Sequence, residues 1–217
     1  MPKDLAIVLN NGSINSAVVT AMAAQRYRPI MIFADMTPGA AGRMRAAFDQ
    51  QIAHFKPYRE YSVPIALAGT GPAQTTTGVT DPRQGPNISP QMLDLLPLIA
   101  LAVKSAAHHQ AAAIYFGLRV GPGTDELAQA TEFCQIWSEM IQMPCGLTEL
   151  ELLAPLLELE PWQVIDVGFQ VSAPLDRTWS CVEETSEPCW ACRGCKAREA
   201  AFQQAGKPDP LRMVKKS

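Results

Sequence analysis

Short apolar runs alternate with longer amphipathic segments along the first third of the chain. The runs at residues 5–10 and 29–35 are almost entirely apolar, which is typical of strands buried on both faces of a sheet. A third strand is expected at residues 60–66. Helical patterns separate the three runs, and Ser13 or Asn15 can cap the first helix. This alternation predicts a parallel sheet covered by helices.

The second half of the chain continues the alternation. We expect, in order, a helix at 91–110, a strand at 112–118, a helix at 124–141, a short strand ending at Pro155, and helices at 160–170 and 195–206. Pro97 should bend the first of these helices, and Gly206 should close the last. The tail from Lys207 is expected to be loosely held.

A stretch rich in Gly, Thr and Pro covers residues 67–90 and has almost no apolar periodicity. A loop of this length is either functional or a mobile surface insertion. Periodicity stops again after Leu175. We therefore predict an α/β domain at residues 1–175 and a small C-terminal module at residues 176–217.

The bulk composition excludes some classes of function. The chain has 217 residues, of which 47% are hydrophobic and 18% charged, and its net charge is -3. That balance gives no sign of a nucleic-acid or membrane partner. The N-terminus lacks the long apolar region of a signal peptide, and no run approaches a membrane span. We expect a cytoplasmic protein.

Four of the six cysteines lie together in "SCVEETSEPCWACRGC". They are Cys181, Cys189, Cys192 and Cys195. In a cytosolic protein, thiols at such short spacings favour a metal over disulfides. Four thiolates suit tetrahedral zinc and leave no position for water, so the site should be structural. An iron–sulfur cluster and four unliganded thiols are the alternatives.

Residues around the cysteines suggest supporting roles. Gly194 should give the tight turn its backbone freedom. The side chains of Arg193, Lys196 and Arg198 could offset the negative charge of four thiolates on a divalent ion.

Candidate ligand-binding residues follow the predicted strands. Ligands of open α/β sheets bind at the carboxyl ends of strands, where Asp35 ends the second run and Arg119 follows the fourth. Asp125 and Glu132 come next and either line the pocket or serve as favourable helix-start charges. The pair His108 and His109 is expected to be a surface helix end rather than an acid–base or metal site.

The cysteine segment carries a resemblance to a known family. Its "RTWSC" and "PCWACRGCKAREAAFQQAGKPDP" resemble the 7-cyano-7-deazaguanine synthases of the queuosine pathway, in which a Thr-x-Ser-Cys element precedes a CxxCxxC element and an Arg-x-x-Ala-Phe helix. Weaker matching blocks are "IMIFAD", "GLRVGPGTDELAQATEFCQIW" and "LLAPLLELEPWQVIDVGF".

The resemblance implies a fold, an activity and a set of ligands. The fold would be a Rossmann-like, adenine nucleotide α-hydrolase-like sheet with an ATP-pyrophosphatase loop after the first strand. Family members adenylate the carboxylate of 7-carboxy-7-deazaguanine, and ammonia displaces AMP to give an amide. A second ATP-dependent step gives the nitrile. Zinc on the four cysteines, Mg²⁺ with the ATP, and a homodimer are also implied.

The loop after the first strand departs from the family pattern. The family reads Ser-Gly-Gly-x-Asp-Ser, whereas this chain reads "NGSINS". Gly12 and Ser16 are kept, while Asn11, Ser13 and Asn15 replace Ser, Gly and Asp. A phosphate loop aims backbone N–H groups at oxygens. Ser13 would crowd a phosphate but could donate its hydroxyl to it, and Asn15 lacks the family's negative charge.

Three further departures remove charged groups. Residues 36–39 replace the family's Tyr-Gly-Gln-Arg, and Arg43 or Arg45 could substitute in space. Glu160 and Pro161 stand where the family has Thr-Lys. The family's Pro-Gly-Arg-Asn block, expected before the middle helix, has no arginine counterpart in "PQMLDLLP".

Two hypotheses about function follow. In the first, the chain is an ATP-dependent C–N ligase of the synthase type. ATP would bind at Asn11, Gly12, Ser13, Asn15, Ser16 and Asp35, and a deazaguanine-type substrate at Arg119, Asp125 and Glu132. In the second, it is a divergent paralogue that acts on another substrate or serves as a non-catalytic nucleotide-binding or scaffold protein.

Overall fold

The computed structural model describes residues 4–35, 42–65, 90–123, 125–183 and 185–213. Elements of the first half are β1 (Leu5–Leu9), α1 (Ile14–Arg26), β2 (Arg28–Asp35), α2 (Gly42–Phe55), β3 (Arg59–Pro64) and α3 (Pro90–His109). Those of the second half are β4 (Ala113–Tyr115), α4 (Asp125–Gln142), β5 (Glu151–Leu153), α5 (Pro161–Gln170), a 3-10 turn η1 (Leu175–Arg177), α6 (Arg193–Gln204) and α7 (Pro210–Met213).

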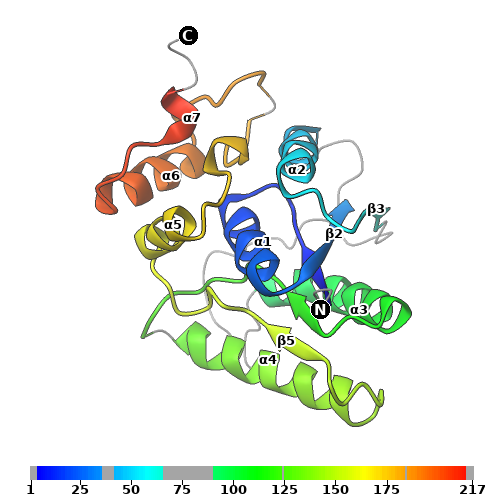
Figure 1. Ribbon diagram of the computed structural model, residues 1–217. Helices are drawn as coiled ribbons and strands as arrows, with labels where there is room; N and C mark the ends of the chain where they lie inside the picture. Colours follow the sequence, from blue (N-terminus) through cyan, green and yellow to red (C-terminus); the bar gives the residue numbers. More distant parts are fainter. Residues whose placement is uncertain (1–3, 36–41, 66–89, 124, 184, 214–217) are drawn as a thin grey trace.

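Within these ranges, five parallel strands form one sheet in the order β3-β2-β1-β4-β5. β1 lies at the centre, where Ala6 pairs with both Pro29 of β2 and Ala113 of β4. Helices cover both faces of the sheet (Figure 1). The predicted Rossmann-like α/β architecture is therefore confirmed. β2 and β3 lie on one side of β1, and β4 and β5 lie on the other. The direction in which strands are added therefore reverses between β1 and β4.

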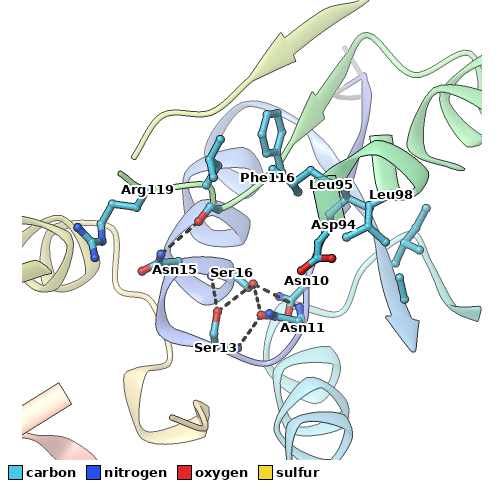
Figure 2. A pocket seen from close by; sticks show the side chains of 15 residues that line it. Asn10, Asn11, Ser13, Asn15, Ser16, Asp94, Leu95, Leu98, Phe116 and Arg119 are labelled. Atoms are coloured by element: carbon cyan, nitrogen blue, oxygen red, sulfur yellow. Dashed lines mark hydrogen bonds between the residues drawn. The ribbon is translucent and has the colours of Figure 1, made fainter. Parts of the chain in front are cut away.

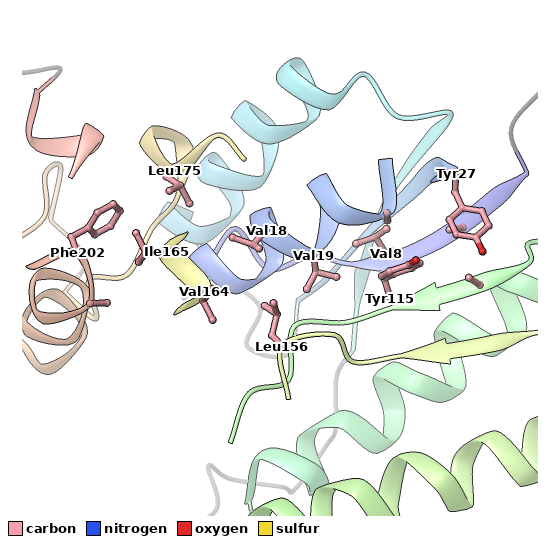
Figure 3. Packing of buried hydrophobic residues seen from close by; sticks show 14 residues of the cluster. Val8, Val18, Val19, Tyr27, Tyr115, Leu156, Val164, Ile165, Leu175 and Phe202 are labelled. Atoms are coloured by element: carbon pink, nitrogen blue, oxygen red, sulfur yellow. The ribbon is translucent and has the colours of Figure 1, made fainter. Parts of the chain in front are cut away.

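Both faces of the central strand are buried, which explains its unbroken apolar sequence. Ala6 and Val8 point into a cluster with side chains of α1 and α5. Ile7 and Leu9 point to the opposite face, into a cluster with side chains of α3 and α4. Figure 3 shows the first cluster, which extends outward through α5 to α6.

The C-terminal segment shares this first cluster. Phe202 of α6 is 2% exposed and packs in the same cluster as Val8 and Val18. The division of the chain at residue 175 stays a prediction, but this packing joins the two parts through common apolar contacts.

The expectation of a loosely held tail is wrong for its described residues, because a buried ion pair anchors it. Arg198 donates to Asp209 through Nε at 2.7 Å and through Nη2 at 2.8 Å, with side-chain exposures of 2% and 6%. Arg198 also donates to Thr178 Oγ1 at 2.7 Å and to the Leu175 carbonyl at 2.9 Å. Its charge is therefore paired with Asp209, which corrects its expected role of offsetting thiolate charge.

Some element boundaries differ from the sequence expectations. α3 continues through Pro97 as one helix, and the bend expected at that residue stays a prediction. β4 is shorter than expected, because the chain leaves the sheet after Tyr115, and β5 ends at Leu153, before Pro155. Of the predicted loop at 67–90, residues 67–89 lie outside the described part of the chain, and Pro90 is the first residue of α3. None of the helices in the described ranges combines the length and hydropathy needed to span a membrane.

We predict that Asp209→Ala lowers the free energy of unfolding by about 3–5 kcal/mol, because it leaves the buried Arg198 guanidinium without its counter-charge. Urea titration followed by circular dichroism measures the effect. Glu199→Ala is the matched control, since it breaks the exposed pair with Arg212 at 2.8 Å and should cost under about 1 kcal/mol. Equal losses in the two variants would contradict the assignment.

Candidate functional site

A cavity of about 430 Å³ opens at the carboxyl ends of β1 and β4, at the point where the strand order reverses. This is the position at which open α/β sheets bind ligands, and the volume is in the range of small-molecule sites. Its described lining comprises Leu9, Asn10, Asn11, Ser13, Asn15, Ser16, Ile32, Ala34, Asp94, Leu95, Leu98, Phe116, Gly117, Leu118 and Arg119.

The loop after β1 forms the polar wall of this cavity (Figure 2). Ser13 is the N-cap of α1, and its hydroxyl accepts from the Ser16 N–H at 3.3 Å. The side-chain oxygen of Asn11 accepts from the Ser16 hydroxyl at 2.7 Å and from the Ser13 N–H at 3.2 Å. The Asn11 amide oxygen thus accepts hydrogen bonds from two donors that could otherwise bind a phosphate oxygen at the N-terminus of α1.

Asn15 ties the loop to the neighbouring strand. Its side-chain amide donates to the Gly117 carbonyl at 3.2 Å, just beyond β4. A Cβ on Gly117 would lie 3.0 Å from the Cβ of Asn15, so a larger residue at 117 would push the two walls apart. Asn15 therefore connects the two walls of the cavity, although it carries no charge.

Buried side chains hold the loop from behind. Asn10 is 2% exposed, and its amide donates to Thr20 Oγ1 and Gln51 Oε1, both at 2.9 Å. Gln51 of α2 is fully buried and donates to the carbonyls of Gly12 at 3.2 Å and Arg177 at 3.0 Å. This network joins β1, α2 and the segment that leads to the cysteines.

The predicted binding residues divide into two groups. Those that line the cavity are Asn11, Ser13, Asn15, Ser16 and Arg119. The others do not: Gly12 is buried behind the loop, Ala34 rather than Asp35 reaches the cavity, and Asp125 and Glu132 are exposed on α4. Their roles in ligand binding stay predictions.

Sequence reasoning missed Asp94, which lines the cavity from α3. It is the only acidic residue in that helix and stands in its second turn within an otherwise apolar segment. An isolated charge in an apolar helix was the sequence feature that could have indicated a functional residue. Arg119 lies on the other side of the cavity and donates weakly to the Leu159 carbonyl at 3.4 Å.

A second cavity, of about 360 Å³, lies between the loop and the cysteine segment. Ser13 lines both cavities. Arg43 and Trp179 line the second one, and the guanidinium carbon of Arg43 lies 5.9 Å from the Trp179 ring centre. Arg45, the other candidate for replacing the family arginine, pairs with Asp49 at 2.9 Å. Residues 36–39 lie outside the described part of the chain.

The four clustered cysteines converge as predicted, with all four sulfurs within 4.8 Å of one another. The Cys181–Cys189 sulfurs lie 3.5 Å apart, those of Cys181 and Cys192 3.8 Å, and those of Cys189 and Cys195 4.0 Å. Tetrahedral ligands at a metal–sulfur distance of about 2.3 Å are separated by about 3.8 Å. The cluster therefore fits a single bound metal ion.

Backbone N–H groups point at these sulfurs and help to set their ionisation. Donation from the Val182 and Cys195 N–H groups lowers the pKa of Cys192 to about 6, whereas burial raises the pKa of Cys195 to about 12. Gly194 is required for a different reason than expected. A Cβ at this position would lie 1.9 Å from the Ser180 carbonyl oxygen, so close backbone approach, not special torsion, requires glycine.

The chain is similar in sequence to proteins of a known family. Residues 95–206 match the model of the family described as "Queuosine biosynthesis protein QueC". A 7-cyano-7-deazaguanine synthase from Aliarcobacter butzleri is 30% identical over 52% of this chain and 50% of its own length. One from Koribacter versatilis is 26% identical over 95% of this chain and 92% of its own length.

Among solved structures, the chain resembles a U34-tRNA thiolase NcsA from Methanococcus maripaludis with its [4Fe-4S] cluster. The TM-score is 0.48 and the identity 13%, over 99% of this chain and 67% of that one. At that level, the likeness says nothing about what this chain binds.

We predict that Gln51→Leu destabilises the protein by about 1–3 kcal/mol, because the variant removes the partner of one Asn10 amide N–H and of the Arg177 carbonyl. Gln50→Leu is the control, since residue 50 is exposed on the same helix and should change stability by about 0.5 kcal/mol or less. Urea unfolding of both variants measures the difference. A wild-type midpoint for Gln51→Leu would contradict the network.

Proposed function

We propose that this chain, which belongs to the QueC family, carries out the full ATP-dependent reaction of a 7-cyano-7-deazaguanine synthase. ATP would transfer AMP to the carboxylate of 7-carboxy-7-deazaguanine, releasing pyrophosphate. Ammonia would then attack the acyl carbon and expel AMP, leaving the amide. A second ATP would carry away the amide oxygen to give the nitrile.

The position of the cavity supports this proposal most strongly. It lies at the reversal point of the sheet, between the loop after β1 and the residues after β4. The first turn of α1 faces it and leaves backbone N–H groups without an intrahelical acceptor, an arrangement suited to phosphate. If a phosphate oxygen took the place of the Asn11 amide oxygen, the Ser13 N–H and the Ser16 hydroxyl would still have an acceptor.

The loop also favours a second candidate, a protein that binds a nucleotide without turning it over. No carboxylate comes from the described residues of the loop, where Asn15 uses its amide to bind Gly117. Mg²⁺ usually needs one or two carboxylates in addition to the phosphates. In this second candidate, ligand binding at the loop would remain while adenylation is lost.

We propose zinc as the ion held by Cys181, Cys189, Cys192 and Cys195. Three pairs of these sulfurs lie 3.5–4.0 Å apart, which is the spacing of ligands that share one ion. In a four-iron cluster each cysteine binds a different iron atom, so the sulfurs must stand farther apart. A site with four thiolates would be structural and would link the end of η1 to α6.

The ATP proposal is tested at Ser13. Ser13→Asp keeps an N-cap residue but places a negative charge beside an incoming phosphate, so ATP affinity should fall by at least about tenfold. Ser13→Asn keeps the cap without the charge and should lose much less. Titration calorimetry with ATP and Mg²⁺ compares the variants. Equal affinities would place the phosphates elsewhere.

Turnover separates the two candidate functions. The wild-type protein with 7-carboxy-7-deazaguanine, ATP, Mg²⁺ and ammonium should release AMP and form the nitrile, as detected by mass spectrometry. ATP binding without AMP release would instead favour the non-catalytic protein. Absence of ATP binding would overturn both.

Elemental analysis tests the metal. We predict one zinc per chain in the wild type and in Cys145→Ser, because Cys145 is exposed and outside the cluster. Cys189→Ser should lose the zinc. Iron together with acid-labile sulfide would show a cluster instead.

A further inference from the structure

Asp94 supplies the one carboxylate in the described lining of the main cavity. Its side chain is exposed and makes no ion pair or hydrogen bond within the described residues. Figure 2 shows it projecting from α3 into the cavity, across from Asn11. A carboxylate that faces a cavity accepts hydrogen bonds there, so it selects for ligands that present hydrogen-bond donors or positive charge.

The cavity wall on the side of Asp94 is apolar. Leu95 and Leu98 follow it on α3, and Phe116 lies beside them in the same wall. Leu9 and Ile32 complete this side of the cavity. Such a surface suits the faces of a flat heterocyclic ring, whereas a strongly hydrated Mg²⁺ ion needs polar neighbours to hold its water.

The charge of Asp94 also bears on which ligand occupies this side. The residue faces the loop that would hold phosphates, and a carboxylate repels phosphate. A neutral ring that presents N–H groups avoids this repulsion. The family's arginine block has no counterpart in this segment, so the described part of α3 presents a carboxylate to the cavity instead of a guanidinium.

We propose that Asp94 is a specificity-determining residue that binds the donor edge of a 7-deazaguanine-type base. This inference rests on the proposed function and names the group that would recognise its substrate. The two carboxylate oxygens accept from the ring N1–H and from the 2-amino group, in a paired arrangement like that of guanidinium with carboxylate. A base that presents an acceptor at N1, as adenine does, is rejected because two acceptors then face each other.

The test compares two ligands that differ in one group: 7-carboxy-7-deazaguanine and its analogue without the 2-amino group. Each is titrated calorimetrically, without ATP, into the wild type, Asp94→Asn and the control Glu149→Gln. Asn matches Asp in size but carries no charge. Glu149 is an exposed carboxylate just before β5, at the amino end of the sheet and away from the cavity.

We expect the wild type and Glu149→Gln to prefer the amino-bearing ligand by at least about tenfold, since one charge-assisted hydrogen bond is lost with the analogue. In Asp94→Asn the preference should fall to about threefold or less. An unchanged preference in Asp94→Asn, or no binding of either ligand to the wild type, overturns the inference.

A parallel titration with ATP and Mg²⁺ distinguishes metal binding by Asp94 from recognition of the base. Loss of ATP affinity in Asp94→Asn, with the base preference intact, would make Asp94 a metal ligand and contradict the inference. Conversely, a base preference that depends on Asp94 in a protein without turnover would uphold the inference while the proposed reaction fails.

Discussion

The backbone at Gly12 is the constraint on which the rest of the site depends. Its φ of +81° is one that other residues rarely adopt, and a Cβ there would lie 2.3 Å from the Met44 carbonyl oxygen. Its own carbonyl accepts from the Gln51 amide at 3.2 Å and from the Trp179 N–H at 2.9 Å. The loop is therefore fixed at once by β1, by α2 and by the chain that enters the cysteine cluster.

This arrangement connects the four-cysteine cluster to the loop that lines the main cavity. Cys181 comes two residues after Trp179, and it lines the second cavity together with Ser13 of the loop. A metal ion that ordered the cysteine segment would also order the Trp179 N–H that holds Gly12. The cysteines and the loop, far apart in sequence, thus belong to one structural unit, with the Arg198–Asp209 pair behind it.

The sequence predicted most of the fold, because buried strands such as residues 5–10 and 29–35 carry their burial in their composition. The cysteine cluster was predictable from spacing alone. The isolated charge of Asp94 is visible in the sequence, but its position opposite the loop depends on how α3 packs on the sheet and could not be predicted. The buried pair of Arg198 and Asp209 was missed for the same reason: two charged residues eleven positions apart give no sign that they are buried together.

The central claim is that the loop after β1 still receives phosphate despite its altered sequence. The most direct measurement is a crystal structure with a non-hydrolysable ATP analogue and Mg²⁺. We expect a phosphate oxygen within hydrogen-bond distance of the Ser13 N–H and the Ser16 hydroxyl, with the Asn11 amide turned away from both. A nucleotide bound elsewhere, with the Asn11 bonds to Ser13 and Ser16 intact, would contradict the account.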